Sequence, residues 1–399
     1  MCGFVVMSIQ LFYLYRNGFN SKKEGNSKQK SASSYAIVSM AFIRTAVKYT
    51  FFAIYGLLVA YVMTVFIDTR TFTDSDRIES QNMVDGTAAR PYVYRMLIPG
   101  ITRIIVKLTP VSVEGEYNDR AARSSIYWFI TKYNFGPSAQ RLVMAPKFLY
   151  TRSVLALVMA AFLAGYACMQ YRLAQYLVPE QWAIALLSPV LGLLLIPTLT
   201  FPQLMIYDPG VLFCSAICYY YMAKQQWGRY LTCFFVATIS KETSIFMAVF
   251  FSLYYFPRLP RIEFFRLLVL QLAIYGSTKL WISLLFMNNI GLPLEDHLKN
   301  QIGSFLHPNY TLGDAVDCFM GMYIIFYRWQ EKPLFARYSL WIVLALFIAY
   351  IFYGNPGEYR IYFDMFPLLA ILVTDTLVSC TYINMIPLFK RVPSQSLSP

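Results

Sequence analysis

Long apolar runs constrain this chain more than any other feature. A helix needs about 20 apolar residues to cross the hydrocarbon core of a bilayer, and apolar runs recur from residue 47 to residue 386. Hydrophobic residues make up 57% of the chain and charged residues only 14%, against roughly 25% charged in soluble domains. The sequence therefore predicts an all-α, polytopic transmembrane helical bundle, and it excludes collagen-like, disordered and disulfide-scaffold chains.

The apolar runs predict about ten spans, within a range of nine to eleven. They fall at 47–67, 149–171, 182–200, 207–223, two short arms within 230–256, 263–286, 312–328, 339–353 and 365–386. The stretch 230–256 carries Lys241-Glu242-Thr243 at its centre, and a single span would place these charges at the costly middle of the bilayer. We therefore expect a helical hairpin there, turning at Ser240–Ser244.

Basic residues predict the orientation, because Lys and Arg collect in short cytoplasmic loops. With the hairpin in place, both chain ends are cytoplasmic and the short outer loops contain only Lys241, Lys299 and Arg360 as basic residues. The net charge of +13 is then explained mainly by Lys and Arg in the cytoplasmic loops of a protein embedded in the lipid bilayer. We therefore expect no nucleic acid partner. The expected location is a multi-pass position in a bacterial inner membrane, or in the ER membrane of a eukaryote.

Three segments complete the predicted organisation. Residues 1–34 form an apolar stub and a basic cytoplasmic linker, residues 35–389 a single transmembrane domain, and residues 390–399 a cytoplasmic tail. Three interpretations of the run Met1–Tyr15 stay open: an extra span, an interfacial helix or a wrongly chosen start codon. Within the domain, residues 68–148 form a long extracytoplasmic loop with amphipathic surface helices, and Met96–Pro110 suits an interfacial or re-entrant helix better than a span.

Under this orientation, the unusual ionisable residues fall on the outer side of the membrane. Carboxylates can remove protons or hold a metal ion, and guanidinium groups suit phosphate oxygens. Each residue also has an ordinary interpretation as a solvated acid, a snorkelling base, a helix cap or a local ion pair. Their joint placement predicts a site for transfer from a lipid-linked phosphate donor, and the segments concerned are Asp68, Asp74-Ser75-Asp76, Asp85, Arg90–Arg95, Tyr207-Asp208-Pro209, Lys241-Glu242-Thr243, Lys279 and Glu358-Tyr359-Arg360.

This layout resembles the GT-C class of integral-membrane glycosyltransferases over residues 45–386. Asp68 and Asp74-Ser75-Asp76 follow the first span, as an aspartate does in that class. Met96–Lys107 is similar to its surface helix, and Lys241-Glu242-Thr243 to its hairpin turn. Three further motifs are similar to those of a bacterial group of multi-pass proteins placed near the class: Arg90-Pro91-Tyr92-Val93-Tyr94-Arg95, Tyr207-Asp208 and Glu358-Tyr359-Arg360.

The resemblance implies a polyprenyl-phosphate-linked sugar donor and a glycan or lipid acceptor. Asp74 is the first choice for the general base, although the first outer loop offers four candidates: Asp68, Asp74, Asp76 and Asp85. Asp76 is the second catalytic candidate, and it is also a candidate ligand for the acceptor or for a divalent cation (Mg²⁺ or Mn²⁺). The residues implied in donor binding are Arg90, Tyr94, Arg95, Asp208, Lys241, Glu242, Lys279, Glu358 and Arg360.

Three alternatives stay open at this point. A transporter or flippase of a lipid-linked or anionic solute needs polar groups in both halves of the membrane, and the inner half offers only Thr238 and Asp375. A polysaccharide polymerase or ligase usually has a large outer loop late in the chain, whereas the long loop here comes early. A non-catalytic assembly subunit would lack paired charges. Seven cysteines without a C-x-x-C pair predict neither a disulfide framework nor a zinc site.

Overall fold

The computed structural model describes residues 26–68, 79–124, 148–200, 204–292, 297–306, 312–354 and 358–380. Over these ranges the chain is all-α, as predicted, with fifteen α-helices joined by turns and short 3-10 helices. The α-helices are α2 (Asn26–Asp68), α3 (Ser80–Asp85), α4 (Leu97–Leu108), α5 (Val111–Ala122), α8 (Leu149–Leu177), α9 (Trp182–Thr200), α10 (Asp208–Ala223), α11 (Trp227–Ser240), α12 (Ile245–Tyr255), α13 (Arg261–Leu285), α14 (Leu298–Leu306), α15 (Leu312–Phe326), α16 (Leu334–Arg337), α17 (Ser339–Tyr353) and α18 (Phe366–Cys380).

The chain divides into two compact units, residues 1–50 and residues 51–399, with the boundary inside α2. In the first unit the structure describes only the beginning of α2, from Asn26 to Thr50. The second unit contains all the other helices. The predicted division at residues 34 and 35 stays a prediction, and the apolar run Met1–Tyr15 lies outside the described residues.

Four helical segments are long and apolar enough to cross a membrane, as in a multi-pass membrane protein. They are Thr45–Ile67, Leu149–Leu177, Arg261–Leu285 and Leu334–Tyr353. The prediction of about ten spans is therefore wrong. Helices do form at each of the ten predicted positions, but the remaining six are too short or insufficiently apolar to count as spans.

Helix length explains this difference. An α-helix rises about 1.5 Å per residue, so the 16 residues of α10 cover only about 24 Å, against roughly 30 Å of hydrocarbon. The 14-residue helix α11 and the 11-residue helix α12 are shorter still. The apolar runs in the sequence continue through turns, where the backbone leaves the helix, so the length of a run overestimates the length of the helix inside it.

The predicted hairpin within 230–256 is confirmed. Helix α11 ends at Ser240, a 3-10 turn (η4) covers Glu242–Ser244, and α12 begins at Ile245. The break occurs at Lys241, whose backbone is extended (φ −157°, ψ 150°). The membrane side on which this turn lies stays a prediction.

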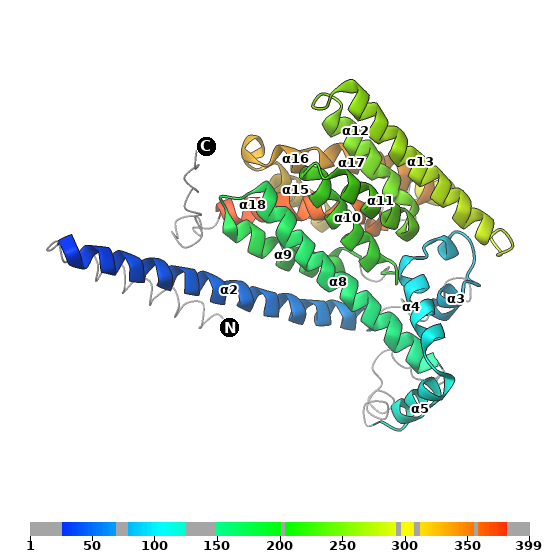
Figure 1. Cartoon of the computed structure of the whole chain (residues 1–399). Coiled ribbons are helices and arrows are strands. Elements are labelled where there is room, and N and C mark those ends of the chain that lie inside the picture. Colours follow the sequence, from blue (N-terminus) through cyan, green and yellow to red (C-terminus); the bar gives the residue numbers. More distant parts are fainter. Residues whose placement is uncertain are drawn as a thin grey trace. The chain divides into compact units, whose positions relative to one another are not determined.

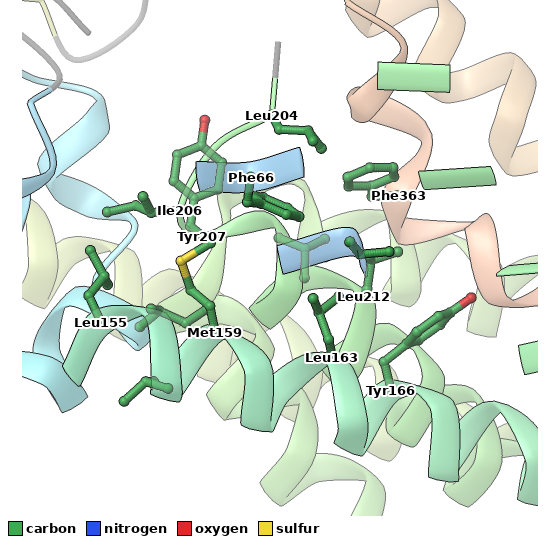
Figure 2. Packing of buried hydrophobic residues seen from close by; sticks show 14 of the residues in the cluster. Phe66, Leu155, Met159, Leu163, Tyr166, Leu204, Ile206, Tyr207, Leu212 and Phe363 are labelled. Carbon is green, nitrogen blue, oxygen red and sulfur yellow. The ribbon is translucent and has the colours of Figure 1, made fainter. Parts of the chain in front are cut away.

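The core of the second unit is built around α8 and α10. Helix α10 packs against α8 and α11, α8 also contacts α9 and α4, and α13 packs against α11 (Figure 1). Leu155, Met159 and Leu163 of α8 face Leu212 of α10 and the preceding Ile206 in a closely packed apolar cluster (Figure 2). This packing fixes the start of α10, where the polar residues discussed below are found.

Asp375, which the sequence places in the inner half of the membrane as an expectation, has a partner within the protein. It lies on α18, and its carboxylate is 3.4 Å from the ammonium of Lys332, a buried side chain between η5 (Trp329–Glu331) and α16. The same ammonium donates to the Leu372 carbonyl and to the Thr376 hydroxyl, both at 2.6 Å. This ion pair joins two segments of the bundle.

Candidate functional site

Five segments of the second unit meet at one place. They are the turn before α4, the start of α10, the α11–α12 turn, the middle of α13 and the 3-10 helix η6 (Tyr359–Asp364). The Met96 amide donates to the Ile239 carbonyl at 3.2 Å, and the Tyr275 hydroxyl to the Glu242 carbonyl at 3.0 Å. The first bond attaches the end of α11 to the turn before α4, and the second attaches the α11–α12 turn to α13.

A group of ionisable side chains fills this meeting point. We call it the charge cluster, and its members are Arg95, Tyr207, Asp208, Lys241, Glu242, Lys279, Glu358, Arg360 and Asp364. Four are cationic and four carry a carboxyl group. Because charged groups are costly to bury unless they are paired, their partners decide what the cluster can do.

A chain of hydrogen bonds runs through the middle of the cluster. The Arg95 guanidinium contacts Glu242, with Nη2 at 2.5 Å from Oε1, and also donates to the Tyr207 hydroxyl. Arg360 donates to the same hydroxyl at 2.7 Å and forms an ion pair with Glu358 at 2.7 Å. The chain therefore runs Glu242–Arg95–Tyr207–Arg360–Glu358 and connects four separate segments.

Lys241 is close enough to both aspartates of the cluster to interact with their charges. It interacts electrostatically with both Asp364 and Asp208, and Asp364 also accepts a hydrogen bond from the Thr243 hydroxyl at 2.5 Å. Burial lowers the pKa of Lys241, and it raises the pKa of Asp208 and of Asp364. All three side chains therefore shift towards the neutral form.

Several polar atoms of the cluster have unused bonding capacity. The Lys279 ammonium is buried and has no hydrogen-bond partner within the described residues. The Lys241 ammonium makes neither a hydrogen bond nor an ion pair within 4.0 Å in that part of the chain. Asp208 accepts from the Met205 amide at 2.8 Å through Oδ2, while Oδ1 is unpartnered, as is the buried hydroxyl of Ser240. Unused buried polar atoms are the usual sign of a missing ligand or water.

The structure brings most of the predicted donor-binding residues together. Arg90 and Tyr94 are the exceptions. The Arg90 amide donates to the Ile290 carbonyl at 2.8 Å, and Tyr94 packs against the apolar core. Among the described residues, neither side chain bonds to the charge cluster. Gly291 has a φ of +95° and lies close to the Arg90 backbone. A Cβ atom on residue 291 would collide with the Arg90 carbonyl oxygen, so only glycine fits there.

Asp74 and Asp76, the predicted catalytic residues, lie outside the described residues, so their roles stay predictions. Within the described ranges, no three His, Cys, Asp or Glu side chains are placed to hold a metal ion. The predicted Mg²⁺ or Mn²⁺ ligand is Asp76, which these ranges do not include.

Two members of the cluster were not predicted. Tyr207 belongs to the motif Tyr207-Asp208-Pro209, but the chain has 32 tyrosines, so its residue type alone does not mark it as functional. Asp364 had a signal, since it is a lone acid in the apolar segment 361–366. Its buried position beside Thr243 shows the value of that signal.

Comparison with known proteins identifies no relative. No family model matches the chain, and neither does any curated protein or solved structure. The charge cluster and the sequence are therefore the features that point to a function.

Proposed function

We propose that this chain is a membrane-embedded glycosyltransferase. It would move a sugar from a polyprenyl-phosphate donor to a glycan or lipid acceptor on the extracytoplasmic or lumenal side. The supporting observation concerns the ammonium groups of Lys241 and Lys279, which both interact electrostatically with Glu242 and have no hydrogen-bond partner in the described part of the chain. An anionic group is the ligand that this pair lacks, and the phosphate of a lipid reaches such a site from the bilayer.

The two arginines of the cluster have a different task. Arg95 and Arg360 are already in ion pairs with Glu242 and Glu358, so each guanidinium is fixed in place before a ligand arrives. Fixed charges stabilise a developing negative charge at a low reorganisation cost. The lysines are therefore the direct phosphate ligands in this proposal, and the arginines supply the surrounding positive field.

The proposed reaction is a single displacement. Asp74 takes the proton of the acceptor hydroxyl, and the acceptor oxygen attacks the anomeric carbon of the donor sugar. The bond from that carbon to the phosphate oxygen breaks, its electron pair stays on the phosphate, and the configuration inverts. Lys241 and Lys279 stabilise the charge that the phosphate gains, while Asp76 is the candidate to hold the acceptor or a divalent cation.

A transporter or flippase is the main alternative, because it would also bind an anionic group. It needs a polar path through the other half of the membrane, and Asp375 was the acid that favoured such a path. The Asp375 carboxylate is occupied by Lys332, whose ammonium also binds Leu372 and Thr376. Groups whose bonds are used within the protein are poorly suited to a passing solute, which favours transfer over transport.

The binding half of the proposal is tested with the full-length chain in detergent. We expect undecaprenyl phosphate to bind and the uncharged alcohol undecaprenol not to bind. Lys279→Met should weaken phosphate binding at least tenfold with only a small change in the melting temperature, because the Lys279 ammonium interacts with Glu242 but makes no hydrogen bond in the described part of the chain. The control Lys299→Met changes an exposed lysine of α14 and should leave both unchanged. Equal binding of phosphate and alcohol would contradict the proposal.

The transfer half is tested with a radiolabelled polyprenyl-phosphate hexose in membranes that contain the chain. We expect the label to leave the lipid in the wild type and to stay on it in Asp74→Asn, at equal protein levels. Full transfer in both Asp74→Asn and Asp76→Asn would remove the assignment of the base. Label that crosses the membrane while still attached to the lipid would favour transport.

A further inference from the structure

Tyr207 lies at the centre of the charge cluster, immediately before α10. Its ring is almost completely buried and packs in the apolar core. Figure 2 shows its hydroxyl at the end of the ring that points away from Leu155 and Met159 of α8. The apolar part of the side chain thus fixes the ring, while the hydroxyl reaches the polar groups.

The phenolic oxygen accepts two hydrogen bonds. One comes from Arg95 and the other from Arg360, at 2.7 Å for the latter. The Arg95 guanidinium also lies 4.4 Å from the centre of the tyrosine ring. A phenolic oxygen has two accepting positions and one O–H donor. Both accepting positions are occupied, so only the donor remains.

The O–H proton of Tyr207 has no acceptor within the described residues, because the hydroxyl bonds there only to the two arginines. Burial raises the pKa of Tyr207 far above its usual value, so the proton stays on the oxygen. The two guanidinium groups also draw electron density from the oxygen, which strengthens the hydroxyl as a donor. A strong, buried donor without an acceptor is costly and indicates an acceptor on a ligand.

We propose that Tyr207 donates its hydroxyl proton in a hydrogen bond to an oxygen of the bound phosphate, beside Lys241 and Lys279. This inference rests on the proposed function, because the phosphate is that of the lipid donor. It makes Tyr207 a residue that binds the lipid-linked sugar. Arg95 and Arg360 then become positioning residues, since they hold the phenolic oxygen so that its proton can face only the ligand.

A change in acidity at this one hydroxyl tests the proposal. Site-specific incorporation of 3-fluorotyrosine at position 207 keeps the hydroxyl but makes it a better donor and a poorer acceptor. We expect undecaprenyl phosphate to bind at least twofold more tightly to the fluorinated full-length chain in detergent. Tyr207→Phe, which keeps the ring but removes the hydroxyl, should weaken binding about tenfold.

Tyr255→Phe is the matched control. This buried tyrosine of α12 donates to the Met222 carbonyl at 2.6 Å, outside the cluster, and its loss should not change phosphate binding. Weaker binding in both the fluorinated protein and Tyr207→Phe would mean that the hydroxyl serves only to hold the arginines, and it would overturn the proposal. Unchanged binding in both would also overturn it. A wild-type chain that does not bind the phosphate lipid at all would instead remove the proposed function on which the inference rests.

Discussion

Glu242 determines how the charge cluster responds to pH. Burial alone would raise its pKa, but Arg95 and Lys279 outweigh this effect and lower the pKa to about 2. Because the pKa in the fold lies below the usual value of about 4.3, the ionised carboxylate stabilises the folded state. This contribution is complete above the usual pKa and is lost as the pH falls towards 2.

Glu242→Gln should therefore destabilise the fold by an amount that depends on pH. A hydrogen bond to a charged group contributes about 2 kcal/mol, so we expect the same drop in melting temperature at pH 7 and pH 5 and a smaller one at pH 3. The measurement is thermal unfolding in detergent. Glu116→Gln, which removes an exposed pair with Arg120 on α5, should have little effect at any pH. A drop in melting temperature from wild type to Glu242→Gln that becomes larger at lower pH would contradict the assigned pKa shift.

The sequence predicted the site only where charge is rare. Arg95, Lys241 and Glu358 belong to short charged motifs between apolar runs, and the structure brings all three into one cluster. Tyr207 could not be found in this way, because its importance comes from two arginines that are distant in sequence. Arg90 was included because of its motif, but within the described residues its side chain makes no bond to the charge cluster, so its role stays a prediction.

Among the single elements, α4 is the clearest candidate for a membrane-surface helix. Ile98 and Thr102 are buried, while Ile104 and Leu108 on the same short helix are largely exposed. Exposed apolar side chains in this number are unfavourable in water, but they are typical of a helix that lies in the membrane interface. The location of α4 at a membrane surface stays a prediction.

A spin label can test this location of α4. We expect a nitroxide attached at Ile104→Cys, in a variant without other cysteines and in lipid vesicles, to collide more with oxygen than with a polar nickel complex. The reason is that oxygen is enriched in the hydrocarbon and nickel complexes in water. Glu180→Cys, in the exposed turn between α8 and α9, should show the opposite preference. If the nitroxide collided more with the nickel complex than with oxygen at both positions, α4 would lie in water.

Helix positions followed from the apolar runs, but helix ends did not. The end of α11 illustrates why, since its backbone becomes extended at Lys241, where the turn meets α4 and η6. Such an end is set by contacts with residues far away in the sequence. A count of apolar residues cannot detect them, and for this reason short helices were expected to be spans.

For the whole molecule, the orientation in the membrane can be tested around one span. The segment Leu334–Tyr353 crosses by length and composition, with exposed Glu331 before it and exposed Tyr359 after it. In cells expressing a variant without other cysteines, we expect an impermeant thiol reagent to label Tyr359→Cys directly. Glu331→Cys should react only after permeabilisation, because the span separates the two. Labelling of both from the same side would contradict the orientation.

The shortness of the α11–α12 hairpin affects which molecules can react. Its arms have 14 and 11 residues and rise about 21 and 17 Å, so a hairpin starting at one face of a bilayer stops roughly 10 Å before the opposite face. A turn that stops there would lie below the surface of the bilayer, so an acceptor from the water would have to enter the bilayer region to reach Lys241 and Glu242.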